Sequence, residues 1–448
     1  MRTFILVAVL CLAVLLPISR ANAVNDPTDR LNVLEIELAR QGELIRQQQQ
    51  VIEALQQELS RSKRPEEVQA SPSESSPVDG GSGFFGASAL TNPNISLLLD
   101  TFVHTSSRSN EELEEQGIPG FTSNGLEHRK GFNLRAAELS IFAPVDPYLN
   151  LYANLPITED GVELEEAYVV TTDLPEGFQI KGGKFKSNFS RLNAQHPHAW
   201  DFFDIALPYR AFLGAEGLGG EKGIQFSWLP ALPIYTQFGA EVLQGENDLL
   251  FGADAKSSPH AFSLFVKCSV DTTDNSTLYF GPSVLFGETR NGNIVADAEF
   301  DGDSALYGME AVWKWKPRSR QGLTLQGEYL YLDQHGDLTD TATSVVESLR
   351  RGQDGVYIQG IYRFDRWGVG ARYEVLELLA DRFKQSGDEQ NLGDRPWRAT
   401  AAIEFNPSEF SRIRLQYNHD ESGRDGQDND EAILQFMFGI GAHSAHAF

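Results

Sequence analysis

The fold is decided by alternating stretches, of which the clearest is Arg412-Ile413-Arg414-Leu415-Gln416-Tyr417-Asn418. Its second, fourth and sixth residues are apolar, and the other four are basic or amidic. Successive side chains of a β-strand point to opposite faces, so the stretch predicts a strand with one apolar and one polar face. Residues 356–364 and 397–405 alternate in the same way. A soluble β-sandwich alternates too, so the spacing of such runs along the chain has to decide between the two folds.

Strand-like runs follow one another from about residue 94, and their connections are alternately long and acidic or very short. The runs are 95–105, 132–146, 149–157, 162–172, 178–191, 223–230, 234–243, 261–270, 278–287, 306–316, 323–333, 356–365, 367–378, 397–406, 412–418 and 433–448. An outer-membrane barrel has this rhythm, with tight periplasmic turns, long external loops and an even number of strands. The sequence therefore predicts an all-β transmembrane barrel of about 16 antiparallel strands over residues 94–448.

The N-terminus reads as a secretory signal over residues 1–23. It has an early Arg2, an apolar stretch at residues 4–16 and the small-x-small site Ala21-Asn22-Ala23. The apolar stretch is shorter than the roughly 20 residues that a membrane-spanning helix needs. The predicted mature chain has 35 Lys and Arg against 63 Asp and Glu, a formal charge of -28, and Cys268 is its only cysteine.

Composition excludes several classes of function. The net negative charge makes nucleic acid an unsuitable partner, because its phosphates are negative too. A mean hydropathy of -0.31 and the lack of a second long apolar stretch exclude a helical membrane protein. The sequence contains no nucleophile elbow, phosphate loop or HExxH helix, so neither an enzyme nor a bound cofactor is expected.

Residues 24–60 carry a heptad repeat and predict a periplasmic coiled coil. The a positions are Leu31, Leu38, Ile45, Ile52 and Leu59, and the d positions are Leu34, Gln41, Gln48 and Leu55. Apolar g positions Leu44 and Val51 widen the stripe beyond a two-stranded seam, which favours a trimer. The alternative is a single amphipathic or disordered segment. Residues 61–93, rich in Ser, Pro, Glu and Gly, predict a flexible linker and the entry to the barrel.

The stretch Gly183-Lys184-Phe185-Lys186-Ser187-Asn188-Phe189-Ser190 resembles the Gly-Lys-Phe-Lys-x-x-Phe-Ser stretch of phosphate-selective porins of the O and P type. Glu165-Glu166-Ala167-Tyr168 is similar to the segment that precedes it there. The resemblance implies a trimeric barrel of about 16 strands that admits solutes. This chain differs in its coiled coil, its acidic loops and its sparser Arg and Lys ladder, so selectivity for phosphate does not follow.

General porins fold their third external loop into the barrel, and residues 193–221 are the corresponding connection here. This loop is unusually aromatic, as expected of a loop that packs inside a lumen. The candidate constriction residues are Trp200, Asp201, Asp204, Tyr209 and Arg210.

Strand alternation and position on the fifth run assign a set of charged residues to the inner face of the barrel, where they are expected to line the pore. The basic candidates are Lys181, Lys184, Lys186, Arg191, Arg363, Arg372, Arg398, Arg412 and Arg414. The acidic candidates are Glu310, Glu328, Glu374 and Glu404. Charges of this kind tune selectivity in water-filled pores. In the alternative interpretation, Arg–Glu pairs merely brace neighbouring strands.

Two pairs of histidines are weak candidates for a metal site. His196 and His198 flank Pro197, and His443 and His446 lie near the C-terminus. Imidazoles can bind zinc, but Pro197 holds the first pair apart and ordinary polar histidines explain both pairs. No metal is assigned on this basis.

Together these features predict a trimeric outer-membrane porin for passive diffusion of small hydrophilic solutes or ions, with its N-terminal arm in the periplasm. The expected partners are outer-membrane lipid and lipopolysaccharide, two further copies of the chain, and the barrel-assembly machinery during biogenesis. The arm could also contact the cell wall. The alternative is a structural tether whose barrel is only an anchor. A TonB-dependent receptor needs a plug and about 22 strands, for which the chain has no room.

The predicted coiled coil leads to a test of assembly. Heptads bury their apolar stripe only against partner helices, so we expect deletion of residues 31–59 to convert a heat- and detergent-resistant trimer into a weaker one. Unheated gel electrophoresis and light scattering in detergent measure this change. A truncated chain that is as resistant as the full chain would show that the arm has another task.

Overall fold

The computed structural model describes residues 93–122, 125, 128–252, 259–295, 298–424 and 426–441. The predicted signal, coiled coil and linker therefore lie outside the described residues, except for residue 93, as do His443 and His446. No described helix is both long and apolar enough to cross a membrane.

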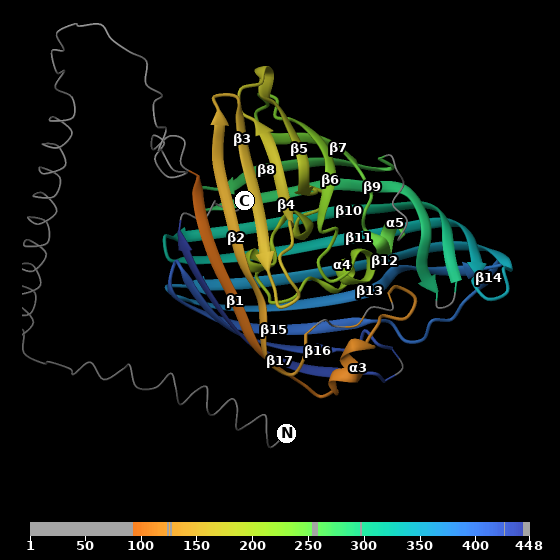
Figure 1. The fold of residues 1–448 in the computed structure, drawn as a ribbon. Coiled ribbons are helices and arrows are strands. Elements are labelled where there is room, and N and C mark those ends of the chain that lie inside the picture. Colours follow the sequence, from red (N-terminus) through yellow and green to blue (C-terminus); the bar gives the residue numbers. More distant parts are fainter. Residues whose placement is uncertain are drawn as a thin grey trace, which may run out of the picture. The chain divides into compact units, whose positions relative to one another are not determined.

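The described chain forms one closed ring of antiparallel strands (Figure 1). Each strand pairs with the next along the chain, and β1 pairs with both β2 and β17, which closes the ring. β14 is a two-residue extension of the β13 ladder, and β13 pairs with β15 directly. The strands are β1 (Asn94–Ser106), β2 (Gly131–Asp146), β3 (Leu149–Ile157), β4 (Glu166–Thr171), β5 (Phe178–Lys186), β6 (Gly220–Trp228), β7 (Tyr235–Leu243), β8 (Ala261–Thr273), β9 (Ser276–Val295), β10 (Ala298–Arg318), β11 (Gln321–Asp340), β12 (Val346–Phe364), β13 (Trp367–Gln385), β14 (Asp388–Glu389), β15 (Trp397–Ser408), β16 (Ser411–Asp420) and β17 (Asn429–Gly441).

The predicted fold class is confirmed, because every described strand except β14 builds the barrel wall and overlaps one predicted run. The boundaries differ most in two places. β5 ends at Lys186 rather than at residue 191. β9 to β13 contain 19 to 21 residues each and continue into connections predicted as acidic loops. Backbone pairing does not require an apolar face, so the ladder extends through polar sequence as long as a neighbouring strand is present.

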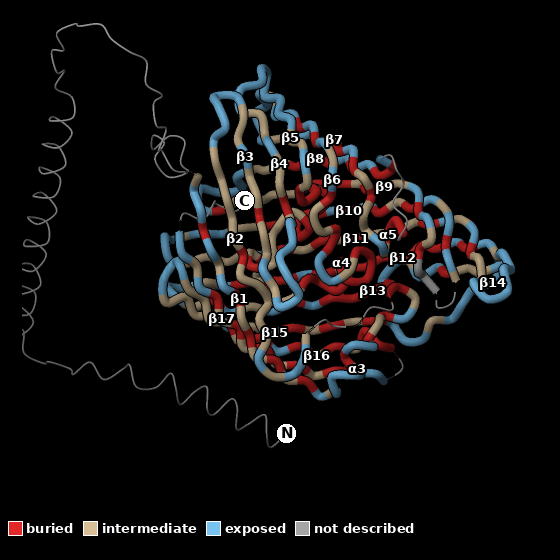
Figure 2. Tube along the Cα trace, in the orientation of Figure 1, coloured by how far each residue is buried: buried red, intermediate tan, exposed pale blue. Residues whose placement is uncertain are grey.

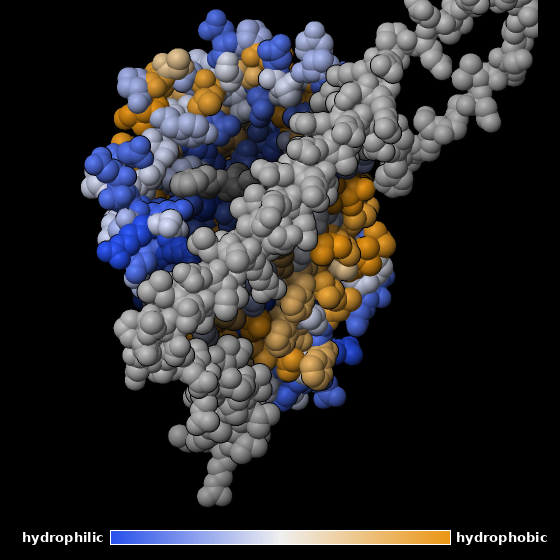
Figure 3. All heavy atoms as spheres, turned by 90° about the vertical axis from the view of Figure 1, so that its left-hand side faces the viewer, coloured by the Kyte–Doolittle hydropathy of each residue, from blue (hydrophilic) through white to orange (hydrophobic). Residues whose placement is uncertain are grey.

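The wall is apolar on its outer face and polar on its inner face. On β15, Ile403 is 41% exposed whereas Glu404 is 4% exposed, and on β16, Tyr417 is 43% exposed whereas Gln416 is 1% exposed. Figure 3 shows a continuous apolar area on the face that it presents. The alternation predicted from residues 356–364, 397–405 and 412–418 is confirmed, with the apolar residues facing outward.

Residues 187–219, which connect β5 to β6 and are called the inserted loop below, lie inside the barrel. They contain two short turns, η2 (Leu192–Ala194) and η3 (Pro197–Ala199), and helix α4 (Leu207–Leu213). Four aromatic residues of the loop are buried in one apolar cluster with inward residues of β9 to β13 such as Leu306 and Leu330, namely Phe189, Trp200, Tyr209 and Phe212. Phe203 packs instead in a smaller cluster with Phe102 and Ile433. Figure 2 shows buried chain concentrated around α4 and the strands that face it. Burying each such side chain stabilises the loop by about 1.5–3 kcal/mol.

Three further helical segments lie in connections. α3 (Asn110–Glu114) lies between β1 and β2, η1 (Pro175–Gly177) lies between β4 and β5, and α5 (Asp248–Phe251) lies between β7 and β8. Connections of two residues join β2 to β3, β8 to β9, β10 to β11, β12 to β13 and β15 to β16, and this end of the barrel is called the short-turn end below. The inserted loop belongs to the opposite, long-loop end.

Candidate functional site

The inserted loop leaves the wall at the stretch that resembles the porins of the O and P type. There, the Ser187 hydroxyl donates to the buried Glu241 of β7, and the Asn188 N–H donates to the same carboxylate over 2.9 Å. Ser190, in the left-handed region at φ 56°, donates through its hydroxyl to Glu328 of β11. Buried carboxylates require hydrogen bonds, so these serines direct the chain from the wall into the lumen.

Glu328 collects hydrogen bonds from the inserted loop. It accepts the Arg191 N–H over 2.8 Å, the Tyr209 hydroxyl over 2.7 Å and the hydroxyl of Tyr357 on β12. Its exposure is only 2%. Glu328 therefore faces inward, as predicted, but the loop covers it, so it does not line a cavity. Glu310 is likewise sealed, in a buried ion pair with Lys267.

The tip of the inserted loop is held by arginines of β13 and β15. Asp204 lies 2.8 Å from Arg372 and 2.7 Å from Arg398, and the Arg398 Nε lies 2.6 Å from Glu374. Burial alone would raise the pKa of Asp204, but the two guanidiniums lower it well below its ordinary value. The Leu207 N–H at the start of α4 also donates to Glu374 over 2.6 Å. This network anchors the loop to the wall.

Three more of the predicted arginines contact the same loop. Arg414 donates to the Trp200 carbonyl over 2.9 Å, and Arg412 donates to the His198 carbonyl over 3.2 Å. Arg363 lies 2.7 Å from Asp201 and 3.0 Å from Glu404. The Arg363 guanidinium holds the pKa of Asp201 below its ordinary value although burial opposes this. All five predicted arginines of β12 to β16 therefore contact the inserted loop.

The predicted loop residue Arg210 is also buried. Its guanidinium donates to the Gln116 carbonyl in the β1–β2 connection over 2.6 Å. Trp200 and Tyr209 are buried as well. Among the five candidate residues of the loop, Asp201 is the one that lines the larger of the described cavities.

The three lysines predicted on β5 have different partners. Lys181 lies over the Tyr168 and Phe185 rings, and Lys186 forms a 2.8 Å ion pair with Glu165. Lys184 lies opposite Lys222 on β6 and 3.7 Å from Glu163. The assignment of these lysines to the lumen stays a prediction.

Two hollows flank the inserted loop. A cavity of about 860 Å³ opens among the short turns, and a smaller one of about 80 Å³ lies toward β1, β2 and β3. Leu98 and His198 line both cavities and therefore lie between them, and this place is called the neck below. The larger cavity is lined by six basic residues against three acidic ones, namely Arg191, Lys314, Lys316, Arg320, Arg363 and Arg412 against Asp201, Asp365 and Glu409. The smaller is lined by five acidic residues and one arginine, namely Asp100, Glu138, Glu163, Glu165, Glu216 and Arg135.

The first histidine pair lies at this neck. The rings of His196 and His198 stack with centroids 5.5 Å apart and planes inclined by 10°. His198 Nδ1 lies 2.8 Å from Glu138, and His196 lies within 3.1 Å of Glu165 and 2.8 Å of Glu166. Burial opposes protonation, but the neighbouring carboxylates raise the pKa of His196 to about 10. The geometry favours ion-paired histidines over a shared metal.

Sequence reasoning missed several residues of the neck. Asp100 and Glu138 face inward by the same alternation that found the arginines, so their signal was present. Arg135 could not be found in this way, because it occupies a β-bulge where the β1–β2 register shifts. The bulge aims its guanidinium at the inserted loop, where it donates to the Phe203 carbonyl over 2.7 Å.

No protein-family model matches the chain. The sequence is 41% identical over 381 residues to an uncharacterized protein of Aquifex aeolicus (strain VF5), and the alignment covers 80% of each chain. Among solved structures, the barrel is similar to the outer membrane channel DcaP of Acinetobacter baumannii, with a TM-score of 0.51 and 12% identity over 79% of this chain and 99% of that one. OprB of Pseudomonas putida is a looser match, with a TM-score of 0.45 and 12% identity over 78% of this chain and 94% of that one. The likeness to DcaP shows a shared fold.

The anchoring network leads to a prediction for Arg398. In Arg398→Gln, Asp204 and Glu374 lose one of the two guanidiniums that contact both of them, and breaking a buried pair costs up to about 3–5 kcal/mol. We expect earlier thermal unfolding and faster cleavage of the inserted loop by protease. Lys222→Gln is the matched control, because its partner Glu246 forms an exposed pair, and it should behave as wild type. Equal cleavage rates for the Arg398 variant and wild type would exclude the anchoring role.

The paired His196 predicts a pH dependence. Its pKa is raised from 6.5 to about 10, so its ion pairs stabilise the loop fully below about pH 6.5 and are lost as pH rises toward about 10. The protease sensitivity of His196→Gln should therefore exceed that of wild type at about pH 6 and match it above about pH 10. His335→Gln, with a side chain 57% exposed, should show no such convergence. A difference that is constant with pH would contradict this assignment.

Proposed function

The chain belongs to one family with the uncharacterized Aquifex aeolicus protein, and we propose that it is an outer-membrane channel for passive diffusion of small hydrophilic solutes or ions. The observation that carries the proposal is a barrel with an apolar outer face and charged cavities inside, narrowed by its own inserted loop. Such a wall suits a bilayer outside and water inside. The fold shared with the channel DcaP supports the same proposal.

The neck between the two cavities is the proposed constriction. Solute passing it meets the Leu98 side chain on β1 and the His198 ring on the inserted loop, with Arg412 on one side and Glu138 on the other. Charges at a narrow point act at close range on every passing ion. The proposed pore-lining arginines of the predicted set are therefore Arg191, Arg363 and Arg412, whereas Arg372, Arg398 and Arg414 position the loop.

The division of charge supports a weak selectivity. The cavity at the short-turn end is basic, and the smaller cavity together with the long connections is acidic. Loop charges in water are screened beyond about 8 Å at physiological salt. We expect the basic cavity to dominate at high salt and give a weak preference for anions, with cations attracted as salt is lowered. Residues 183–190 turn the loop inward and do not line the larger cavity, so their resemblance to phosphate-selective porins carries no argument for phosphate.

The proposal extends to assembly. A wall with exposed apolar side chains requires lipid, and the acidic long-loop end suits divalent cations bridging to lipopolysaccharide. We propose that three copies associate and that the arm predicted at residues 24–60 extends into the periplasm. Insertion of such a barrel requires the assembly machinery of the outer membrane.

Single-channel recording tests both the channel and its selectivity. The purified, folded chain should give discrete conductance steps in planar bilayers, and Arg412→Gln should move the reversal potential in a salt gradient toward cations, because it removes one cation from the neck. Lys222→Gln, on the outer face, is the control and should leave the potential unchanged. Absence of steps would favour the structural tether. A potential that moves only when loop acids are removed would exclude the basic cavity as its source.

A further inference from the structure

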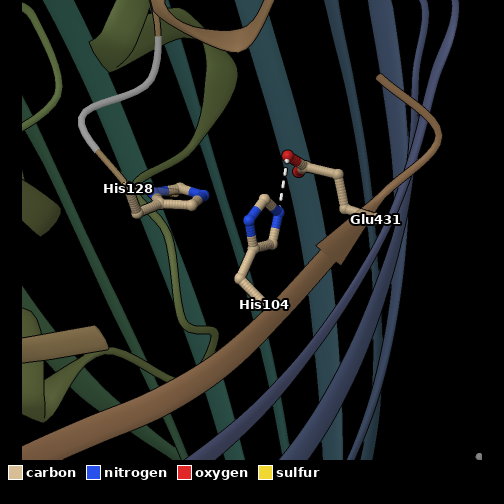
Figure 4. A group of neighbouring side chains, drawn as sticks. All are labelled: His104, His128 and Glu431. Atoms are coloured by element: carbon tan, nitrogen blue, oxygen red, sulfur yellow. Dashed lines mark hydrogen bonds and ion pairs between the residues drawn. The ribbon is translucent and has the colours of Figure 1, made fainter. Parts of the chain in front are cut away.

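Two histidines and a glutamate from three separate segments meet inside the barrel (Figure 4). His104 lies near the end of β1, Glu431 lies near the start of the adjacent β17, and His128 lies in the connection that leads to β2. The His104 and His128 rings stand edge to face, with centroids 4.5 Å apart and planes inclined by 86°. None of these residues belongs to the neck or to the histidine pairs considered from the sequence.

The donor atoms are spaced for a single ion. His104 Nε2 lies 3.2 Å from Glu431 Oε1, and one potential donor from each residue lies within 4.8 Å of the other two. In a tetrahedral zinc site with bonds of about 2.0–2.1 Å, donors lie about 3.4 Å apart. A modest inward movement of His128, which lies outside the strands, would complete this geometry.

Two nitrogens in this cluster lack hydrogen-bond partners. His104 is 1% exposed and its Nδ1 is unpartnered, and the buried Nε2 of His128 is unpartnered as well. A metal ion bound to the Nε2 of His104 beside the Glu431 carboxylate would leave Nδ1 as the protonated nitrogen of that ring. Unsatisfied buried polar atoms are costly and rare, and the same ion would satisfy the Nε2 of His128.

The surroundings suit a cation. Amide groups of Asn418 and Asn429 each donate to Glu431 over 3.2 Å and hold its carboxylate in place. Such supporting hydrogen bonds are typical around metal ligands.

We propose that His104, His128 and Glu431 bind one divalent transition metal ion of the zinc class, with water at the remaining position. A mixed nitrogen and oxygen donor set of this kind favours zinc and its neighbours over calcium or magnesium. The His128 ring also meets the Phe203 ring edge-on, with centroids 5.8 Å apart. A bound ion therefore fastens the β1–β2 connection to the wall beside the tip of the inserted loop.

Metal titration of the full, folded chain in detergent tests the proposal. Isothermal titration and elemental analysis with Zn²⁺ should find one ion per chain, and His128→Gln should weaken binding at least about tenfold, as loss of a ligand or its support does. His335→Gln and the double variant His443→Gln, His446→Gln are controls that should bind like wild type. Because His128 is outside the barrel ladder, its variant should keep the heat-dependent gel shift of a folded barrel.

Cobalt supplies an independent readout. Co²⁺ bound at this site should show the intense visible absorption of a four-coordinate ion, and this absorption should vanish in His128→Gln and in Glu431→Gln. Weak absorption of a hexaaqua type, or no saturable binding, would overturn the proposal. Binding that survives His128→Gln but is lost in His196→Gln would place the ion at the neck and overturn it as well.

Discussion

The arrangement of the barrel interior depends on the buried carboxylates of the inner wall, because each of them requires hydrogen-bond donors. Glu241, Glu328 and Glu374 lie on separate strands, and each accepts a backbone N–H from the inserted loop. Without the loop these groups would face either water or one another. With the loop in place they are desolvated, so each needs the donors that the loop supplies. The wall and the loop are therefore interdependent. The buried carboxylates fix the path of the loop, and the loop removes these carboxylates from water and supplies their hydrogen-bond donors.

This interdependence determines which charged side chains remain accessible to a solute in the proposed channel. Most arginines of β12 to β16 are used to hold loop carboxylates and carbonyls, and the apolar cluster under α4 fills the lumen on the side of β9 to β13. In the proposed channel, the path leads from the basic larger cavity past the neck to the acidic smaller cavity beside β1, β2 and β3. The lining charge therefore changes along the proposed path more than across it.

The sequence predicted the architecture well because alternation and strand number follow from local rules. The period of two assigned Arg398 and Glu404 to the inner face, and the aromatic content of residues 193–221 indicated a loop packed against apolar surface. The contacts that each inward side chain makes could not be predicted in this way. Whether Arg414 faces water or the Trp200 carbonyl depends on where the loop lies, the bulge at Arg135 depends on strand register, and the cluster around His128 joins segments more than 300 residues apart in sequence.

The unequal strands give the barrel an oblique rim. A strand of 20 residues, such as β9 or β11, is about 68 Å long at about 3.4 Å per residue, whereas about ten residues cross a bilayer. The surplus lies at the long-loop end and only on the side of β9 to β13, while β3 to β7 have 6 to 9 residues each. In the proposed orientation, one side of the barrel extends further beyond the membrane than the other, so the rim of the proposed channel opens toward the side of the short strands.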